Sequence, residues 1–331
     1  MFKKIVVAAI IASLNISIAN AAPEYEKKLR REKVTIALDW FINADHAPIF
    51  VAQQIGAFKE QGIDVDIIEP KTPTDPTTGV ANHKTDLAVG YQPEIYTLVD
   101  KGLPIVRIGT LINQPLNMVA ALPSAQIKEI ANLKGKKIGY ASGDKTPFTL
   151  KKMLASAGLT LNDVTLVNVG FKLVSALENK SVDAVYEVYR NIEGVQFAYD
   201  TKTNPVEFYV ENYGIPRYDE LVIFANKKDI GSIKIAKFMQ GLKKGTEYLL
   251  AHPEKSWRKF AMLHPELNTE REHATWNASL QYFAHDPIAL NKERYRRYRD
   301  FSYDNHLISK KLPVSSYAVK IHTVPEKDSE D

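Results

Sequence analysis

The chain of 331 residues contains no cysteine. This absence excludes disulfide bonds, thiolate ligands for a metal, cysteine nucleophiles and a lipid-modified N-terminal cysteine. A secreted domain without disulfides depends on the size of its hydrophobic core. With 45% apolar residues, a chain of this length can build two domains of ordinary size. The composition therefore suits a bacterial periplasmic protein better than a small extracellular module.

The chain also lacks a strong charge of either sign. Its formal net charge is +4 and falls to +2 when Lys3 and Lys4 leave with the leader segment described below. The stretch KERYRRYR at 292–299 mixes basic and aromatic residues, but it is more typical of a solvated helix face whose tyrosines cover the core. We therefore expect no nucleic-acid partner.

Only the N-terminus carries a long apolar run. Residues 1–21 have a basic start, an apolar stretch over 5–19, and the small-x-small sequence Ala-Asn-Ala at 19–21 that signal peptidase requires. The run is shorter than the ~20 residues needed to cross a bilayer, so a membrane anchor is the weaker interpretation. We predict a cleavable signal peptide, a periplasmic location and no stable membrane insertion.

Several motifs of enzymes and metal proteins are missing. The segment GKKIGYASGDK lacks the GxxxxGK[ST] spacing of a phosphate-binding loop. No GxSxG nucleophile elbow occurs, and the eight histidines form no HxxxH pair. We therefore predict a protein that is not an enzyme, with no catalytic residue, no bound metal and no cofactor.

Strand-like and helix-like segments alternate twice along the chain. The first series has apolar strands at 34–40, 65–68, 86–90 and 105–111, separated by helical patterns at 47–61, 76–82 and 93–100. The second has strands at 133–142, 164–169 and 183–186 with helices at 145–157, 172–179 and 191–198. This alternation predicts α/β units with parallel sheets and helices on both faces.

Two extended segments, 113–123 and 208–226, connect the two series. Beyond residue 229 the pattern is helical at 230–251, 254–263, 269–281 and 290–301, with His-Pro breaks at 252–253 and 264–265. Two crossings predict that the C-terminal part completes the first domain. We expect one lobe from 34–115 plus 220–320, a second lobe from 116–219, and a flexible tail at 321–331.

Polar and aromatic side chains follow several of the expected strands. Ligands bind at the carboxyl ends of parallel strands, where loops and helix N-termini meet. Trp40, Asn43 and His46 follow one strand, and Tyr91 ends another. A flat aromatic face with amide and carboxylate groups at its edge suits a heteroaromatic ligand. For Trp40 alone, a place in the core or at a domain interface is an equally good interpretation.

Glu193 and the segment YGIPRYDEL leave alternatives open. Glu193 begins an expected helix, where a negative charge stabilises the terminus without any ligand. It could instead accept hydrogen bonds from an amino group or ring N–H of a ligand. Tyr218, Asp219 and Glu220 lie beside the expected hinge and suit either ligand contact or a plain turn. Arg190 is the one nearby group that would favour an anionic ligand.

The stretch LDWFINADHAPIFVAQQIGAFKEQGIDVDIIEP, with DLAVGY, LKGKKIGY, VDAVYEVYRNIEG and YGIPRYDEL, resembles the periplasmic binding proteins that capture pyrimidine precursors of thiamine for an ABC importer. The similarity covers about residues 34 to 260. It implies a type II periplasmic-binding-protein fold, with two α/β lobes joined by a two-segment hinge. It also implies a monomer that binds a small heteroaromatic ligand and delivers it to a permease.

The resemblance also implies a set of ligand-binding residues. Trp40 would stack on the pyrimidine, and Glu193 would hold its amino edge. The other expected contacts are Asn43 and His46 at the ring edge, Tyr91, Tyr189 and Asn191 on the facing wall, and Tyr218 and Glu220 on the hinge side. The pair Phe41-Ile42 departs from the family, in which a proline commonly precedes the asparagine.

Two alternatives accompany this interpretation. The first is a binding protein for riboflavin or another flat heterocycle. The second is a pyrimidine synthase that consumes pyridoxal phosphate and shares the fold. That enzyme needs a lysine and a histidine where Gln92 and Tyr96 stand here, and it carries a cysteine-rich motif that this chain lacks.

Overall fold

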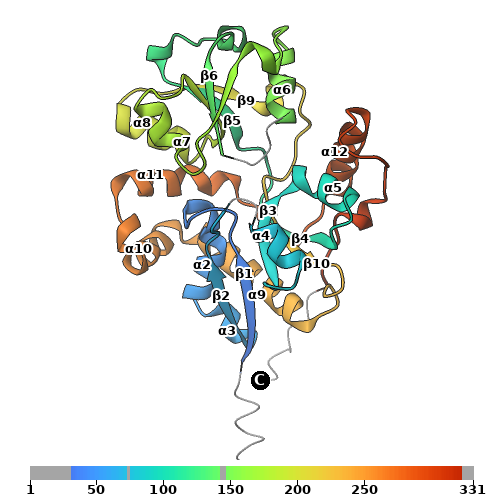
Figure 1. The fold of residues 1–331 in the computed structure, drawn as a ribbon. Coiled ribbons are helices and arrows are strands. Elements are labelled where there is room, and N and C mark those ends of the chain that lie inside the picture. Colours follow the sequence, from blue (N-terminus) through green and yellow to red (C-terminus); the bar gives the residue numbers. More distant parts are fainter. Residues whose placement is uncertain (1–30, 73–74, 142–146, 323–331) are drawn as a thin grey trace, which may run out of the picture.

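The computed structural model describes residues 31–72, 75–141 and 147–322. The expected signal peptide at 1–21 lies outside these ranges, as do residues 323–331 of the tail expected at 321–331, whereas Ile321 is buried in the core. The described chain forms two lobes (Figure 1). Each lobe is built on one five-stranded sheet. The expected two-lobe α/β architecture is thus confirmed.

The sheet of lobe 1 has the strand order β2-β1-β3-β10-β4. Strand β1 runs parallel to β2 and β3, whereas β10 is antiparallel to β3 and β4. The expected parallel arrangement therefore holds for β2, β1 and β3 but not for β10, because the strand that returns from lobe 2 enters in the opposite direction. The bounds are β1 Glu32–Ala37, β2 Ile63–Ile68, β3 Leu87–Tyr91, β4 Ile105–Ile112 and β10 Leu221–Asn226.

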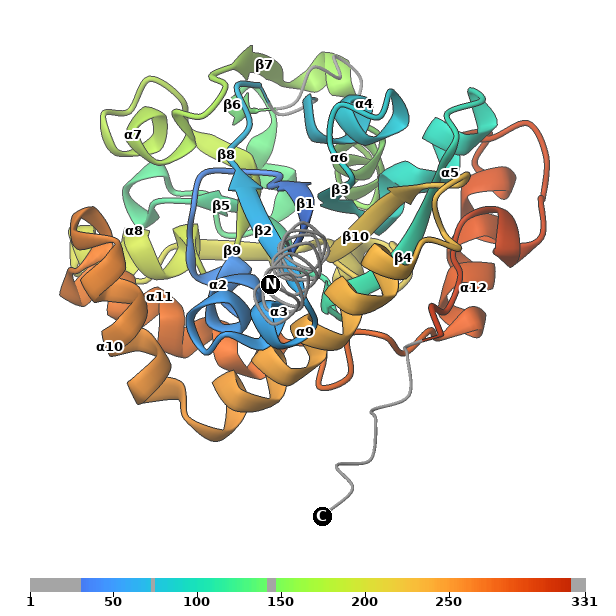
Figure 2. The same ribbon diagram turned by 90° about the horizontal axis from the view of Figure 1, so that it is seen from below.

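Helices cover both faces of this sheet (Figure 2). α2 (Ala47–Gln54), α3 (Ala57–Glu60) and α9 (Ile233–Ala251) cover one face, and α4 (Asp75–Ala81) and α5 (Gln92–Asp100) cover the other. All six residues of β10 are buried, because alternate side chains enter the two layers. Leu221 and Ile223 join the core on the α9 side, and Val222 and Phe224 join the core on the α5 side.

Close packing of α2 on α9 depends on a glycine. A Cβ atom on Gly245 would lie 2.4 Å from Cβ of Ala52. The helix expected over 47–61 breaks at Gly56, whose φ of 82° is left-handed, so that α2 and α3 are separate helices. Gly62, with φ of 72°, follows α3 at the position expected of a helix stop.

Lobe 2 repeats the arrangement with its own five strands. The order is β7-β6-β8-β5-β9, with β5 antiparallel to both β8 and β9. The bounds are β5 Asn117–Ala121, β6 Lys137–Tyr140, β7 Thr165–Asn168, β8 Ala184–Tyr189 and β9 Val206–Tyr209, with helices α6 Phe148–Ala155, α7 Leu173–Glu178 and α8 Glu193–Thr201. In each sheet, the strand that follows a crossing between the lobes lies one place from the edge.

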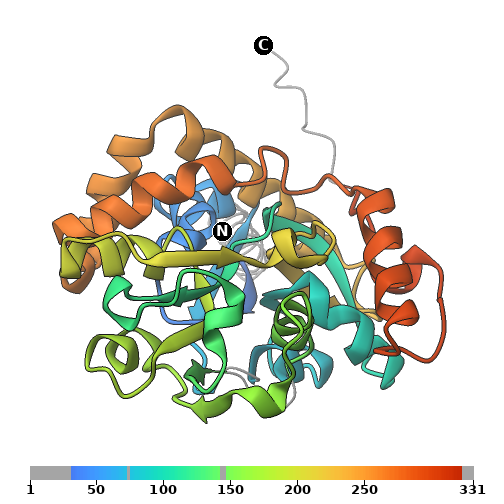
Figure 3. The same cartoon turned by 90° about the horizontal axis from the view of Figure 1, so that it is seen from above.

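Three C-terminal helices complete the molecule. They are α10 (Pro253–Leu263), α11 (Glu270–Ser279) and α12 (Lys292–Asp304), and the expected His-Pro breaks before α10 and after it are confirmed. α11 packs beside α8 of lobe 2, as the views from the side and from above agree (Figure 3). No helix in the described ranges is long and apolar enough to span a bilayer.

The chain crosses between the lobes at 113–116 and at 214–220. These two crossing segments connect β4 to β5 and the short helix Val210–Tyr213 to β10. Their positions agree with the two extended segments seen in the sequence. The exact lobe boundaries at 116 and 219 stay predictions.

Candidate functional site

A cavity of about 310 Å³ lies between the lobes. This volume is at the lower end of the range for small-molecule sites. Seven of the nine expected ligand-binding residues line it: Trp40, Asn43, Tyr91, Tyr189, Glu193, Tyr218 and Glu220. The other two, His46 and Asn191, do not.

The wall from lobe 1 is the loop after β1. Trp40 lies three residues beyond the strand, which is shorter than the sequence suggested. Asn43 caps the next turn: its Oδ1 accepts the N–H of Asp45 at 2.8 Å, and its own N–H donates to Nδ1 of His46 at 3.3 Å. These bonds fix the loop without the proline that the family commonly places there.

His46 is completely buried behind this wall. Its Nε2 lies 2.9 Å from Oδ1 of Asp39, whose Oδ2 accepts the hydroxyl of Tyr91 at 2.8 Å. The expectation that His46 touches the ligand edge is therefore corrected, because Asp39 stands between it and Tyr91. His46 positions Asp39, and Asp39 positions the Tyr91 ring in the wall.

The wall from lobe 2 is formed at the end of β8. Glu193 is the first residue of α8 and accepts the N–H of Tyr189 at 2.7 Å. It thus stands at the helix start and also lines the cavity, and its contact with a ligand stays a prediction. Burial raises the pKa of Glu193 to about 7.

Asn191 connects the lobes instead of lining the cavity. Its Nδ2 donates to Oδ1 of Asp45 at 2.6 Å and to Oγ of Ser279, in α11, at 2.7 Å. The side chain is 1% exposed, so the expected ligand contact is corrected. Asp45 itself lines the cavity, and burial raises its pKa to about 8.

Glu220 connects the two crossing segments. One carboxylate oxygen accepts the N–H groups of Leu116 and Asn117, the latter at 3.0 Å. The other oxygen accepts the hydroxyl of Tyr189 at 3.4 Å. Burial raises the pKa of Glu220 to about 7, while these hydrogen bonds oppose the shift. Glu220 is thus both a cavity residue and a hinge residue.

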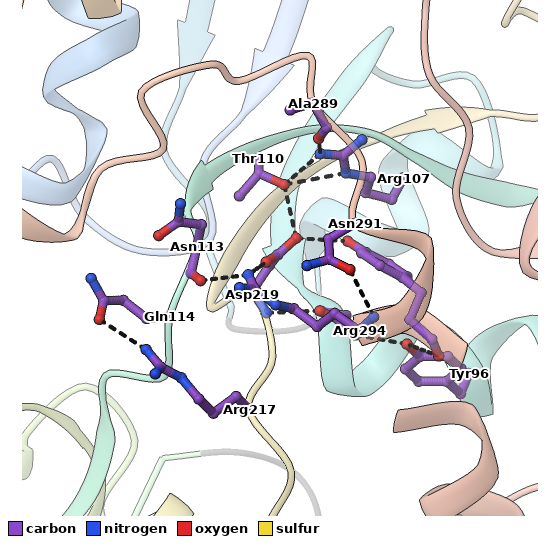
Figure 4. A network of polar contacts seen from close by, with 12 residues as sticks. Tyr96, Arg107, Thr110, Asn113, Gln114, Arg217, Asp219, Ala289, Asn291 and Arg294 are labelled. Carbon is purple, nitrogen blue, oxygen red and sulfur yellow. Dashed lines mark hydrogen bonds and ion pairs between the residues drawn. The ribbon is translucent and has the colours of Figure 1, made fainter. Parts of the chain in front are cut away.

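Asp219 takes no part in the cavity. It accepts the Thr110 hydroxyl at 3.0 Å and pairs with Arg294 of α12 in the network of Figure 4. Arg294 also donates to the carbonyl of Asn113, in the first crossing segment, at 2.5 Å. This network links both crossing segments to α12.

The cavity is strongly acidic. No lysine, arginine or histidine is found among its described lining residues, which include six carboxylates: Asp39, Asp45, Glu94, Glu187, Glu193 and Glu220. Arg190, the possible anion ligand, is instead paired with Glu211 at 2.9 Å and lies over the Tyr209 ring. In the described ranges, no group of three His, Asp or Glu side chains is arranged to hold a metal.

Four of these carboxylates, Asp39, Asp45, Glu94 and Glu187, are not among the nine residues expected to bind the ligand. Asp39 and Asp45 stand inside the motif around Trp40. Glu187 has a left-handed φ of 65° and accepts the N–H of Ala141 at 2.8 Å. Glu94 is the third residue of α5, which follows β3 directly, and its place near the carboxyl end of that strand was the available signal.

Gln92 and Tyr96 face the core instead of the cavity. The Gln92 amide donates to the Tyr96 hydroxyl at 2.7 Å and accepts the N–H of Asp219 at 2.7 Å. Both side chains are fully buried. Neither position therefore presents a reactive group to a bound ligand.

Curated relatives cover most of this chain. A protein of Haemophilus influenzae named for thiamine biosynthesis is 43% identical over 88% of this chain and 93% of its own length. The formylaminopyrimidine-binding protein of Halalkalibacterium halodurans is 34% identical over 68% of each chain. The 4-amino-5-hydroxymethyl-2-methylpyrimidine phosphate synthase of Uromyces fabae is 31% identical over 79% of this chain and 80% of its own.

Solved structures show the fold. The alkanesulfonate-binding protein of Xanthomonas axonopodis pv. citri superposes with a TM-score of 0.67 at 14% identity, over 88% of this chain and 99% of that one. At this identity the likeness shows the periplasmic-binding-protein fold and nothing about the ligand. The family described as NMT1/THI5 like matches residues 43–256, and this chain belongs to that family.

Proposed function

We propose that this chain is an extracytoplasmic solute-binding protein that captures a pyrimidine precursor of thiamine for an ABC importer. The ligand would be of the formylaminopyrimidine or hydroxymethylpyrimidine type. The observation that carries the proposal is the cavity between the lobes, which combines aromatic walls with carboxylates and has no cation among its described lining residues.

The cavity chemistry fits an aminopyrimidine. The rings of Trp40, Tyr91 and Tyr189 offer flat faces for stacking. Asn43 and Glu193 offer an amide and a carboxyl group for the ring nitrogens and the amino group. A sulfonate or nitrate would need cationic donors, which the described walls do not supply.

Closure of the lobes would couple binding to delivery. The ligand contacts come from both lobes. The closed form therefore makes all of them, whereas the open form makes only those from one lobe. A permease that recognises the closed form would then receive loaded protein. The relative named as a formylaminopyrimidine-binding protein supports this role.

The synthase is the second candidate, because a fungal relative carries that name. Its chemistry would need a lysine for pyridoxal phosphate, and Gln92 occupies the corresponding place in the buried core. We therefore propose a protein that binds its ligand and releases it unchanged. A riboflavin-binding role would require a larger cavity than about 310 Å³ or a wider opening of the lobes.

A thermal-shift and calorimetric screen of the mature protein tests the proposal. The panel holds aminopyrimidine precursors, riboflavin, an alkanesulfonate and pyridoxal phosphate. We expect the aminopyrimidines alone to raise the melting temperature, since a ligand that binds only the folded state stabilises it. Trp40→Ala should weaken their binding at least tenfold, and Tyr303→Ala, an exposed aromatic of α12, should not.

Two results would contradict the proposal. One is the absence of any aminopyrimidine effect on the wild-type protein. The other is selective stabilisation by pyridoxal phosphate with pyrimidine product formed on adding iron, which would establish the synthase instead.

A further inference from the structure

One carboxylate of the cavity differs from the other five. Glu94 is the third residue of α5, and its side chain faces the open volume of the cavity. Within the described ranges no side-chain or backbone donor is hydrogen-bonded to its carboxyl group. At its backbone, the carbonyl accepts the Thr97 hydroxyl at 3.0 Å.

The other five carboxylates all have donors from the protein. Their hydrogen bonds come from Tyr91 to Asp39, Asn191 to Asp45, the N–H of Ala141 to Glu187, the N–H of Tyr189 to Glu193, and the N–H groups of Leu116 and Asn117 to Glu220. Each of those five therefore has a structural role in a wall or in the hinge, although Oδ2 of Asp45 is buried without a hydrogen-bond partner in the described part of the chain. Glu94 has no such structural role.

The surroundings of Glu94 are unfavourable for its negative charge. The Glu94 side chain is accessible to solvent in the open cavity, yet loss of hydration between the lobes raises its pKa to about 8, and the charges of Glu187, Asp39 and Glu220 act in the same direction. A position in the first turn of α5 favours a carboxylate, but this effect does not outweigh the others. Among the described lining residues, no positive charge balances that of Glu94.

We infer that Glu94 is a ligand-binding residue that pairs with a positively charged nitrogen of the ligand. The cavity would thereby select a cationic heteroaromatic molecule over a neutral or anionic one. This inference rests on the proposed function and deepens it, because it assigns the charge of the ligand and adds a specificity residue. A phosphorylated pyrimidine would meet six carboxylates and is excluded on the same ground.

The pairing follows from simple electrostatics. A protonated ring nitrogen or amino group beside Glu94 makes a charge-assisted hydrogen bond in an enclosed space, where it is stronger than in water. The ligand charge also relieves the repulsion between Glu94 and its three acidic neighbours. Binding of the cation should release the proton that Glu94 holds in the empty cavity.

The test compares wild-type mature protein with Glu94→Gln and, as a second variant, Glu94→Ala. Glu247→Gln, an exposed carboxylate of α9, is the matched control. Calorimetry measures binding of 4-amino-5-hydroxymethyl-2-methylpyrimidine and of its phosphate ester. Thermal shift measures 4-aminopyridine, a flat cation at neutral pH, against benzoate, an anion of similar size.

We expect 4-aminopyridine to stabilise the wild type and the control, and benzoate to stabilise neither. Glu94→Gln should lose most of the 4-aminopyridine effect and bind the aminopyrimidine at least tenfold more weakly. Proton release, measured as the dependence of the binding enthalpy on the buffer, should decrease in the same variant. Circular dichroism checks that both Glu94 variants are folded.

Failure of this inference is distinguishable from failure of the proposed function. If the aminopyrimidine binds wild type and both Glu94 variants alike, the inference is wrong and the proposed function stands. If 4-aminopyridine stabilises the wild type through Glu94 but no aminopyrimidine binds, the inference stands and the proposed function is wrong. If 4-aminopyridine has no effect on the wild type, the inference is overturned.

Discussion

The Trp40 ring meets the Phe171 ring edge-to-face across the two lobes, with centroids 4.4 Å apart and planes at 84°. Trp40 follows β1 of lobe 1, and Phe171 lies between β7 and α7 of lobe 2. Trp40 packs against the apolar cluster of lobe 2, while Ile192 of lobe 2 enters the core of lobe 1. Each lobe therefore buries apolar side chains of the other in this closed arrangement.

Removal of the Phe171 ring should make the closed form shorter-lived. An aromatic pair contributes about 0.5–1.5 kcal/mol beyond its buried area, so Phe171→Ala should speed ligand release roughly 2- to 13-fold. Stopped-flow measurement of Trp fluorescence after dilution would report the rate. Ile233→Ala, an exposed apolar residue of α9, should leave it unchanged. Equal release rates in both variants would show that these rings do not hold the lobes together.

The buried hydrogen bond between Asn191 and Asp45 should stabilise the same closed form. Asn191→Ala leaves Asp45 and Ser279 without this donor, at a cost of about 1–3 kcal/mol. We expect a lower melting temperature and weaker ligand binding. Asn179→Ala, on the surface of lobe 2, is the control, and a variant that matches it in both measurements would refute the role of Asn191.

Glu220 should be needed for its oxygen atoms more than for its charge. Glu220→Ala leaves two buried N–H groups of the first crossing segment unpaired, and should destabilise the protein by about 2–5 kcal/mol. Glu220→Gln keeps one oxygen for both N–H donors, so its loss of stability should be far smaller. Denaturant unfolding gives both values, and similar losses in the two variants would mean that the charge is essential.

The acidic cavity predicts a stability that decreases as pH rises from about 5 to 8. Unfolded carboxyl groups have a pKa near ~4, whereas burial raises the pKa of Glu220 and Glu193 to about 7 and of Asp45 to about 8. Between these limits the unfolded chain binds fewer protons than the folded one, so raising the pH favours unfolding. Calorimetric melting of ligand-free protein should show a decrease of several degrees.

Asp45→Asn should flatten this pH profile, because the amide oxygen still accepts the Asn191 hydrogen bond and no ionisation occurs at residue 45. A steep profile that is the same in wild type and variant would place its origin in other groups. Below pH ~4 the sign reverses, since Lys234 and Thr35 hold the pKa of Asp86 below its usual value despite partial burial.

The contact between α2 and α9 should tolerate no side chain at residue 245. Gly245→Ala places a methyl group 2.4 Å from Cβ of Ala52, and such overpacking costs about 1–3 kcal/mol even after the gain in helix propensity. Gly231→Ala, where no atom lies within 4 Å of the added Cβ, should be nearly neutral. The decrease in the free energy of unfolding of each variant, measured relative to the wild type, checks the prediction.

Periodicity in the sequence indicated the helices and strands well, since amphipathic patterns and Gly or Pro boundaries are local properties. Strand direction was not local: β10 reads as an ordinary buried strand, and only its route back from lobe 2 makes it antiparallel. Sheet topology therefore had to come from the tertiary structure.

The sequence indicated the location of the candidate site better than it indicated which side chains line it. The ends of β1, β3 and β8 do converge on the cavity, as the rule for parallel strands predicts. Which side chain of a motif faces the ligand depends on hydrogen bonds between distant segments. His46 is hydrogen-bonded to Asp39 and Asn191 to Asp45, so neither side chain lines the cavity. Neither partner could be assigned from sequence spacing alone.

The position of β10 has a consequence for the order in which the chain can fold. This strand lies between β3 and β4, yet about a hundred residues of lobe 2 separate it from them in the sequence. Lobe 2 is continuous and can close its sheet as soon as its own residues are available. During synthesis, lobe 1 must wait with an open gap in its sheet until the second crossing emerges, and in this interval it is the part most exposed to mispairing and aggregation.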